Sequence, residues 1–357
     1  MTVGVEEEFL LVDPSTRRPV ARAVEVLSRV GDLPPGSAVH RELIGTQVEF
    51  ATGVCADLAE LRDQLVAGRR ALADAARAEG LLLVASGTPP LADPAPPLSV
   101  GERFTRIEGM YRAQVTDYQC CGCHVHVGVP DRDTAVHVAD HLRPWLPTLL
   151  ALSGNSPFDQ GRDTGYASGR MLQQAGFPGS GVPPVLRTAA RHDELVARLV
   201  DCGVLVDGSM TFWLARPSPR YPTVEVRAAD TAATVDDAVL QAGLTRALVD
   251  TARAAGEPPE LDEQVLAAAV WSAARYGLTG WGVDPFAGRQ VPAVELVEAL
   301  LEHVSDALGD DRDLVRSLVS RVLTDGTGAE RQRAAGSPED AVDLLACTPA
   351  GTGSPAP

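Results

Sequence analysis

Carboxylate and imidazole side chains recur at alternate positions in short apolar segments of this sequence. In GVEEEFLLV, Glu6 and Glu8 are two residues apart, and in GCHVHVGV the same spacing separates His124 and His126. Alternate residues of a strand point to the same face of a sheet. Each segment, if extended, therefore presents a pair of metal-binding or acid–base side chains on one face.

Two further segments follow the same pattern. Glu49 points away from its apolar neighbours in ELIGTQVEF, and Glu225 shares a face with Arg227 in TVEVRAA. A solvated sheet face is the alternative for any one of these glutamates. If the faces converge, however, the carboxylates repel one another and their pKa values rise unless cations neutralise them. Oxygen ligands of this kind suit Mg²⁺ or Mn²⁺ rather than zinc. The converging set would be Glu6, Glu8, Glu49 and Glu225.

The density of cysteine and histidine in QCCGCHVHVGV first suggests zinc. On a strand, however, His124 and His126 share a face with Cys120, whereas Cys121 and Cys123 point the other way. One tetrahedral site cannot easily collect ligands from both faces of a strand. We therefore expect the histidines to face a site and Cys121 and Cys123 to be core residues. Two surface histidines, or a structural zinc, are the alternatives.

Composition excludes several classes of function. The chain has 357 residues and a formal net charge of −17, and all 31 of its basic residues are arginine. Without lysine there is no Schiff-base, pyridoxal-phosphate or Walker A chemistry. The acidic excess opposes binding to nucleic acid and to anionic lipid. No apolar run is long enough for a membrane span, and the acidic start is unlike a signal peptide, so we expect a cytoplasmic protein with reduced cysteines.

The elements that position these residues can be read from periodicity and turn signals. We expect strands in 3–12, 42–53, 81–85 and 119–129, and a hairpin of MTFWLAR and TVEVRAA. Helices are expected in 57–80, 134–152 and 189–202 and throughout 235–345, with irregular segments at 86–99 and 154–184. The pattern predicts an α+β fold with a largely antiparallel sheet. Residues 1–347 are expected to form a single domain, and 348–357 a disordered tail.

Five motifs in order resemble those of a known family. GVEEEFLLVD, HRELIGTQVEFATGV, GCHVHVGVPD, NSPFDQGRDTGYASGR and YPTVEVRAADT are similar to the type 2 glutamate–cysteine ligases, also called carboxylate–amine ligases. The resemblance runs from Gly4 to about Leu345. It implies a core like that of glutamine synthetase and the guanidino kinases, in which a curved antiparallel sheet holds ATP and Mg²⁺ on its concave face and helices pack outside.

The resemblance also implies roles for individual residues. Arg227 would contact phosphate, and we expect Arg227 and Arg170 to be catalytic and Arg227, Arg162 and His126 to bind the nucleotide. Arg162 and Arg170 could each bind either the substrate carboxylate or phosphate. Arg162 and Arg170 lie in an irregular segment, where salt bridges that anchor the loop are the alternative. Tyr166 and Ser168 could help to position substrate. Glu42 is assigned from the resemblance alone. The implied metal ligands are Glu6, Glu8, Glu42, Glu49, His124 and Glu225.

The implied reaction is an ATP-dependent ligation. A carboxylate, expected to be the glutamate side chain, is activated as an acyl phosphate, and an amine, expected to be that of cysteine, attacks it to give an amide, ADP and phosphate. ATP and Mg²⁺ or Mn²⁺ are the expected cofactors, and small molecules are the expected partners, with self-association left open. The alternatives are a metal-dependent hydrolase that uses the HxH pair, and a non-catalytic relative that binds metal or nucleotide.

Overall fold

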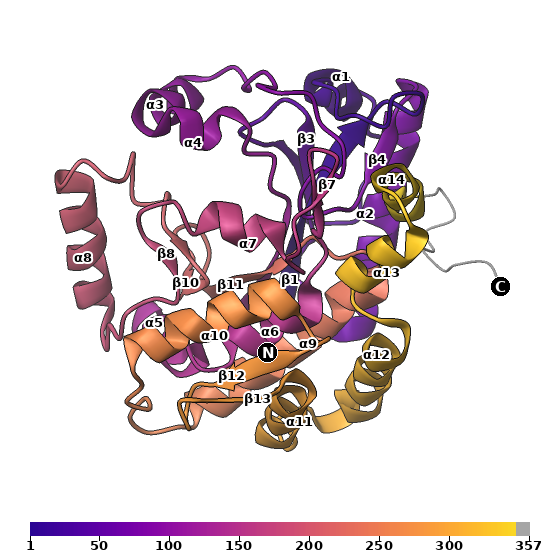
Figure 1. Cartoon of the computed structure of the whole chain (residues 1–357). Helices are drawn as coiled ribbons and strands as arrows, with labels where there is room; N and C mark the ends of the chain where they lie inside the picture. Colours follow the sequence, from indigo (N-terminus) through magenta and orange to yellow (C-terminus); the bar gives the residue numbers. More distant parts are fainter. Residues whose placement is uncertain (348–357) are drawn as a thin grey trace.

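A seven-stranded antiparallel sheet forms the centre of the computed structural model, which describes residues 1–347 (Figure 1). Six strands follow the order β10-β11-β5-β1-β3-β2, and β4 also pairs with β1. The predicted tail at 348–357 lies outside the described residues. The strands are β1 (Val3–Val12), β2 (Ala38–Arg41), β3 (Gln47–Ala51), β4 (Leu82–Val84), β5 (Gly122–Gly128), β10 (Ala215–Pro217) and β11 (Thr223–Asp230).

Six shorter strands form three two-stranded pairs beside this sheet: β6 (Phe158–Asp159) with β7 (Arg162–Asp163), β8 (Ser180–Gly181) with β9 (Phe212–Trp213), and β12 (Trp281–Asp284) with β13 (Arg289–Pro292). The helices are α1 (Ala23–Ser28), α2 (Leu58–Ala78), α3 (Glu102–Tyr111), α4 (Ala113–Thr116), α5 (Arg132–Leu142), α6 (Leu146–Ser153), α7 (Gly169–Gln174), α8 (Ala189–Asp201), α9 (Val235–Arg253), α10 (Glu263–Tyr276), α11 (Ala293–His303), α12 (Arg312–Asp325), α13 (Gly328–Ala335) and α14 (Pro338–Leu345). Among residues 1–347, no helix combines the length and the apolar character needed to cross a membrane.

One face of the sheet is covered by helices, and we call it the outer face. Helices α2, α5, α6 and α9 pack on it (Figure 1). Val5 of β1 and Val125 of β5 lie in the resulting core together with Leu61 of α2 and Val239 of α9. Burial of such apolar surface supplies most of the driving force for folding. The predicted α+β fold, with a largely antiparallel sheet and helices on its outer face, is confirmed.

The opposite, inner face carries polar side chains and lies under a smaller apolar cluster. Ile107 of α3, Val115 of α4 and Phe177, which follows α7, pack together there with Met210. We call this group the cap. Its members are Leu43, Phe177 and residues of the segments 104–118 and 199–212, and it lies across a cavity from the polar residues of the sheet.

Several expected elements differ from those observed. The single helix expected at 134–152 is two helices, α5 and α6, because Pro144 lacks an N–H and its ring clashes with the preceding turn, while Pro147 suits the first turn of a new helix. The segment expected to be irregular at 154–184 contains α7, which Ser168 caps by accepting from the Met171 N–H. The region 235–345, expected to be helical throughout, contains the β12–β13 hairpin.

Other expectations are confirmed. Strands lie within 3–12, 42–53, 81–85 and 119–129, and β10 and β11 form the predicted hairpin. The expected first strand of that hairpin, MTFWLAR, is divided, however, because Phe212–Trp213 form β9 and pair with β8. Helix α2 begins after Asp57, at the start of the helix expected in 57–80. The Asp57 side chain caps the helix by accepting a hydrogen bond from the Glu60 N–H. Strand β2 was not expected; it is short and exposed, and lacks the apolar alternation that marks a half-buried strand.

Candidate active site

The three glutamates of β1 lie on two different faces of the sheet. Glu7 is fully buried on the outer face, whereas Glu6 and Glu8 are half-buried on the inner face. Strand pairing then fixes their neighbours. Glu6 lies opposite His124 of β5, and Glu8 lies opposite Glu49 of β3. The alternation predicted for this segment is therefore confirmed, and the pairing joins three strands at one place.

Strand β5 divides its cysteines and histidines as predicted. Cys123 lies in the core with Val125, and Cys121 is buried against a separate apolar group. His126 lies opposite Glu225 of β11, so the histidines point to the inner face. The cysteines described by the structure are free thiols.

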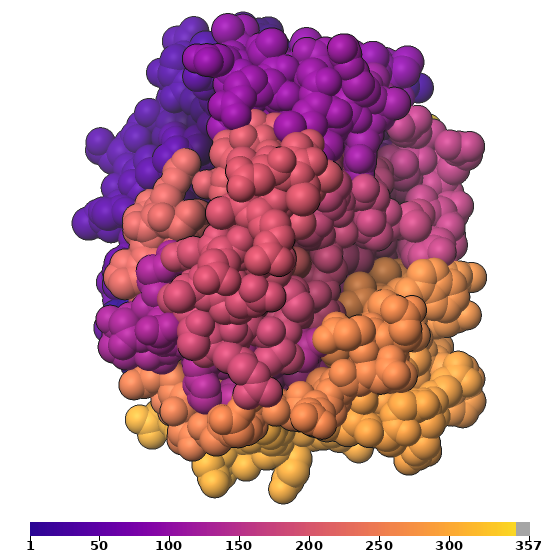
Figure 2. Space-filling model, turned by 90° about the vertical axis from the view of Figure 1, so that its left-hand side faces the viewer, coloured from indigo at the N-terminus to yellow at the C-terminus, as the bar shows by residue number. Residues whose placement is uncertain are grey.

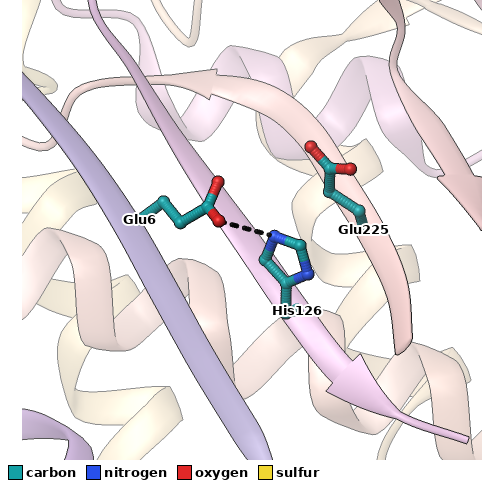
Figure 3. A group of neighbouring side chains, drawn as sticks. All are labelled: Glu6, His126 and Glu225. Atoms are coloured by element: carbon teal, nitrogen blue, oxygen red, sulfur yellow. Dashed lines mark ion pairs between the residues drawn. The ribbon is translucent and has the colours of Figure 1, made fainter. Parts of the chain in front are cut away.

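The first cluster on the inner face combines Glu6, His126 and Glu225 (Figure 3). Each offers a ligand atom within 4.8 Å of the others. Glu6 Oε1 lies 3.4 Å from His126 Nε2, and His126 Nδ1 lies 2.9 Å from the Thr223 hydroxyl, which orients the ring. Burial disfavours the ionised carboxylate of Glu6, but hydrogen bonds from His124 and His126 outweigh burial and lower its pKa below the usual range.

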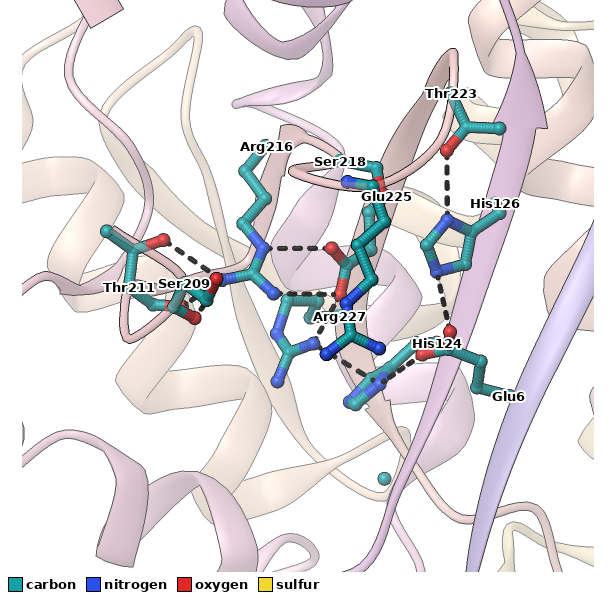
Figure 4. Close-up of polar contacts among 12 residues, drawn as sticks. Glu6, His124, His126, Ser209, Thr211, Arg216, Ser218, Thr223, Glu225 and Arg227 are labelled. Atoms are coloured by element: carbon teal, nitrogen blue, oxygen red, sulfur yellow. Dashed lines mark hydrogen bonds and ion pairs between the residues drawn. The ribbon is translucent and has the colours of Figure 1, made fainter. Parts of the chain in front are cut away.

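Two arginines hold the buried Glu225 (Figure 4). Arg216 donates from Nε and Nη2 at 2.9 and 3.2 Å, and Arg227 pairs with the same carboxylate. Arg216 is itself fixed by the carbonyl oxygens of Ser209 and Thr211, at 3.0 and 2.6 Å. Burial opposes ionisation of Glu225, but the two guanidinium groups hold its pKa well below the usual range. Glu225 is therefore a charged, rigidly oriented ligand.

Arg227 is positioned by an irregularity in β11. The register between β11 and β5 shifts between Val226 and Ala229, as at a β-bulge. Bulges re-aim side chains and are common beside active sites. Here Arg227 lies at the shift and reaches both Glu225 and His124, whose Nδ1 is 3.3 Å from Arg227 Nη1.

The second cluster consists of three carboxylates, Glu8, Glu42 and Glu49, with ligand oxygens within 4.8 Å of one another. Glu42 directly follows β2. Burial and the charges of Glu8 and Glu6 raise the pKa of Glu42 to about 8, and burial together with Glu42 raises that of Glu49 well above the usual range. Within residues 1–347, no ion pair joins any of the three to an arginine.

These clusters fit divalent cations by their donor chemistry. The second offers only carboxylate oxygens, which Mg²⁺ and Mn²⁺ prefer, and its raised pKa values are those of anions crowded together without a counter-charge. The first adds one imidazole to two carboxylates. Sequence reasoning had assigned His124 to metal and His126 to nucleotide. The structure groups His126 with the carboxylates, while His124 lies beside Arg227.

His124 and Arg170 face each other above Gly122. His124 Nε2 is buried without a hydrogen-bond partner, and so are Nε and Nη1 of Arg170. A Cβ at Gly122 would lie 2.6 Å from Arg170 Nη2 and 2.8 Å from His124 Nε2, so only glycine leaves room for both groups. Burial and the nearby Arg227 lower the pKa of His124, which favours a neutral ring. Buried nitrogens without partners indicate that a further group can bind between these two side chains.

The buried Asp230 anchors this side of the site. It accepts from the Ser156 and Ser168 hydroxyls at 2.6 and 2.7 Å, and its Oδ1 lies 3.8 Å from Arg170 Nη1. Arg170 also donates to the Arg227 carbonyl at 3.2 Å. Sequence reasoning missed Asp230 and Arg216. Asp230 directly follows the TVEVRAA segment, but nothing in the sequence indicates that loop serines converge on it.

Not every candidate reaches the clusters. Arg162 is exposed on β7, and no hydrogen bond or ion pair within 1–347 links it to either cluster. Tyr166 contacts Arg275, whose guanidinium lies 5.5 Å from the ring centroid, on a different side of α7. Ser168 acts through Asp230 and as the cap of α7.

Two cavities border the site. One of about 180 Å³ has Glu8, Glu42, His124 and Arg227 at its polar end and the cap at its other end; we call it the cap cavity. A second, of about 470 Å³, lies between α8 and β10 and reaches Arg216. Figure 2 shows this side of the molecule, where α8 and the loop after it lie beneath the segment of α3 and α4.

Comparison with known proteins identifies the family. The model of glutamate–cysteine ligase family 2 matches residues 2–340, and the chain belongs to this family. A protein named "Putative glutamate–cysteine ligase 2-2" from Saccharopolyspora erythraea is 53% identical over 362 aligned residues, covering 98% of this chain and 93% of that protein.

Solved structures show the same fold at low sequence identity. The glutamate–cysteine ligase of Francisella tularensis, solved in complex with AMP, superimposes with a TM-score of 0.70 at 12% identity, over 96% of this chain and 87% of that one. A bifunctional glutathione synthetase from Pasteurella multocida gives 0.68 at 15% identity, over 96% of this chain and 51% of that one.

Proposed function

We propose that this protein is an ATP-dependent ligase that joins a carboxylate to an amine. The proposed carboxylate is the glutamate side chain, and the proposed amine is that of cysteine, after which the family is named. The observation that carries the proposal is the convergence of two carboxylate clusters with Arg216 and Arg227 on one sheet face. Membership of the family supports the same class of reaction.

The donor sets give each cluster a role. Glu6, His126 and Glu225 would hold one divalent cation, and Glu8, Glu42 and Glu49 another. Bound there, Mg²⁺ or Mn²⁺ would neutralise phosphate oxygens and the charge that develops during phosphoryl transfer. The pairing of Glu225 with two arginines fixes one carboxylate of the first cluster before any cation binds.

The arginines supply fixed positive charge around the reacting groups. Arg227 lies between the first cluster and His124, where its fork can donate to a phosphate or carboxylate oxygen. Arg170 has two unpartnered nitrogens, Nε and Nη1, and Asp230 fixes its position. We assign both arginines to binding the negatively charged acyl phosphate that forms when the carboxylate is phosphorylated. Preorganised donors of this kind stabilise developing charge most strongly where water is excluded.

The reaction requires no nucleophile from the enzyme. A carboxylate is a poor acylating agent, so phosphorylation creates a better leaving group, and the amine then attacks the acyl carbon and releases phosphate. The cysteines of this region fit this view. Cys121 and Cys123 lie in apolar cores, Cys120 lines the cap cavity, and burial raises the pKa of all three thiols. They are structural residues in this proposal.

A screen for ADP release tests the proposal. Purified protein would be incubated with ATP, Mg²⁺, one carboxylate and one amine, with every component omitted in turn, and the amide detected by mass spectrometry. We expect product only when all four components are present. Product without nucleotide would exclude the ligase and favour a metal-dependent hydrolase. Nucleotide binding without any turnover across the screen would favour a non-catalytic relative.

A further inference from the structure

The cap contributes an apolar wall to the cap cavity. Leu43, Phe104, Ile107, Met210 and Phe212 form this wall, with polar residues such as Arg103 and Gln174 beside them, and the sheet contributes Glu8 and Arg227. A molecule that fills this cavity would therefore have one end beside the charged clusters and the other against aliphatic and aromatic side chains. Pockets of this type select ligands by shape and apolar contact.

The apolar wall is rigid. Ile107 and Met210 are buried members of the cap. Phe212 packs on Phe177 with ring centroids 4.6 Å apart, and Tyr118 meets Phe177 edge-on at 5.1 Å. Aromatic pairs at these separations hold their neighbours in place. The shape of the cavity is thus set before any ligand arrives.

Several polar groups that line the cavity already have partners. The Gln174 amide donates to the Tyr118 hydroxyl at 3.2 Å, and the Gln47 amide donates to the Cys120 carbonyl at 2.7 Å. Arg103 pairs with Asp207 at 2.8 Å. A charged ligand group placed here would lose its water without gaining a counter-charge, which is costly. The wall therefore discriminates against charged side chains.

The size of the cavity also limits what it can hold. Pockets for drug-sized ligands measure about 300–1,000 Å³, whereas this cavity measures about 180 Å³. It suits the side chain of an amino acid or a simple amine and is too small for a nucleoside. The larger cavity of about 470 Å³, which reaches Arg216 from the other side, has room for one.

We infer that the cap cavity selects the amine substrate, and that amines with an uncharged, apolar side chain of several carbon atoms fit it better than the cysteine after which the family is named. The inference rests on the proposed ligase function. The amine attacks in its neutral form, after its ammonium group has lost a proton to solvent. Its nitrogen then bonds to the acyl carbon, the bond from that carbon to the phosphate oxygen breaks, and the proton of the amine leaves with the phosphate.

The test is a comparison of amines at saturating ATP, Mg²⁺ and glutamate, with kcat/KM from ADP release and amide formation. L-leucine and L-methionine should exceed L-aspartate and L-lysine by at least about tenfold, the scale on which apolar pockets discriminate, and should exceed L-cysteine as well. If aspartate or lysine matched leucine, or cysteine exceeded both apolar amines, the inference would be overturned while the ligase function stood.

A binding measurement distinguishes a failure of the cavity assignment from a failure of the ligase proposal. Calorimetric titration of the full chain with L-leucine and with L-aspartate requires no turnover. Leucine binding that Met210→Glu abolishes would support the cavity assignment even if no amine were ligated, in which case the ligase proposal alone would fail. Equal binding of leucine and aspartate would overturn the assignment whatever the turnover.

Variants at Met210 sharpen the comparison. Met210→Ala enlarges the apolar end and should raise the ratio of kcat/KM for phenylalanine over leucine by about tenfold. Met210→Glu should lower kcat/KM for leucine at least about tenfold and leave the KM for ATP unchanged. Leu199→Ala is the matched control, because Leu199 packs against the same cap without lining the cavity. If Leu199→Ala changed the phenylalanine-to-leucine ratio of kcat/KM as much as Met210→Ala does, the packing of the cap, and not the cavity wall, would set selectivity.

Discussion

Glu7 and Arg69 form a buried ion pair on the outer face of the sheet, directly behind the place where Glu6 and Glu8 meet their partners on the inner face. Arg69 donates from Nε and Nη2 to the two carboxylate oxygens at 2.9 and 2.5 Å, and to the Ala232 carbonyl at 2.8 Å. The three consecutive glutamates of β1 therefore have two different roles. The middle residue ties β1 to α2, and the outer two belong to the candidate site.

Breaking this pair should cost stability and spare the chemistry. Glu7→Gln leaves Arg69 buried without a counter-charge, which typically costs about 3–5 kcal/mol. We expect a lower melting temperature by circular dichroism, with activity per folded molecule unchanged. Replacing both partners, as in Glu7→Leu with Arg69→Met, should recover most of the loss. A Glu7→Gln protein that melts like wild type but is inactive would show that Glu7 belongs to the site.

Removing one carboxylate from the second cluster should have opposite effects with and without metal. Glu49→Gln relieves repulsion, so without metal the protein should melt at the same temperature or higher, and it should lose part of the stabilisation that Mg²⁺ gives wild type. Turnover should fall by at least about 10²-fold. Glu298→Gln, on the exposed side of α11, is the control and should change neither the melting temperature, nor the stabilisation by Mg²⁺, nor turnover. Unaltered Mg²⁺ stabilisation in Glu49→Gln would exclude Glu49 as a ligand.

The same cluster predicts a pH dependence. The pKa of Glu42 is raised to about 8 by burial and by Glu8 and Glu6, so between its ordinary value and about 8 the folded state binds a proton that the unfolded state has released. The protonated Glu42 therefore contributes to the stability of the folded state at low pH, and this stabilisation is lost as pH rises through about 8. Metal-free protein should therefore lose stability between about pH 5 and 8 in urea titrations with EDTA, and Glu42→Gln should flatten that loss.

Metal binding should show the reciprocal effect. Cations bind the ionised carboxylates, so Mg²⁺ should bind more tightly as pH rises towards 8, with release of protons. Calorimetry in two buffers of different ionisation enthalpy measures that release directly. An affinity for Mg²⁺ independent of pH between 6 and 8, in wild type and in Glu42→Gln alike, would contradict the assignment.

The buried cysteines of β5 give a prediction about packing. Replacing Cys121 and Cys123 by alanine should lower stability by roughly 1–2 kcal/mol through lost contacts and leave activity per folded molecule nearly unchanged. Stoichiometric zinc in the wild type that is lost in the double variant would show that the two thiols bind metal after all. Elemental analysis of both purified proteins decides the point.

Much of the site could be predicted from the sequence because it is built on strands. Alternation alone separates Glu6 and Glu8 from Glu7, and His124 and His126 from their neighbours. Alternation cannot say which strands are adjacent, however. That His126 meets Glu225 while His124 meets Glu6 depends on the register of β5 between β1 and β11. The sequence could therefore not show that His126 is the histidine grouped with Glu225, and the assignment of His124 to metal and of His126 to nucleotide stays a prediction.

Residues whose roles depend on partners distant in the sequence were harder to predict. Glu42 was assigned from family resemblance alone, because it follows a short strand with no alternation of its own. Arg170 and Arg162 were treated alike in one irregular segment, yet Arg170 is buried beside Asp230 and Arg162 is exposed. Arg216 was seen only as part of a strand. Its importance comes from the cross-strand partner Glu225, which local patterns do not specify.

The position of β5 between β1 and β11 bears on how the chain is made. Synthesis proceeds from the N-terminus, so β1, β3 and β5 leave the ribosome well before β11. Until then the valine-rich β5 is an unpaired edge, of the kind that promotes association between nascent chains. The arrival of β11 closes that edge and delivers Glu225 to the first cluster in the same event. A cation held there, as we propose, would bind only once the sheet is complete, so Mg²⁺ supplied during expression would stabilise the last step of assembly.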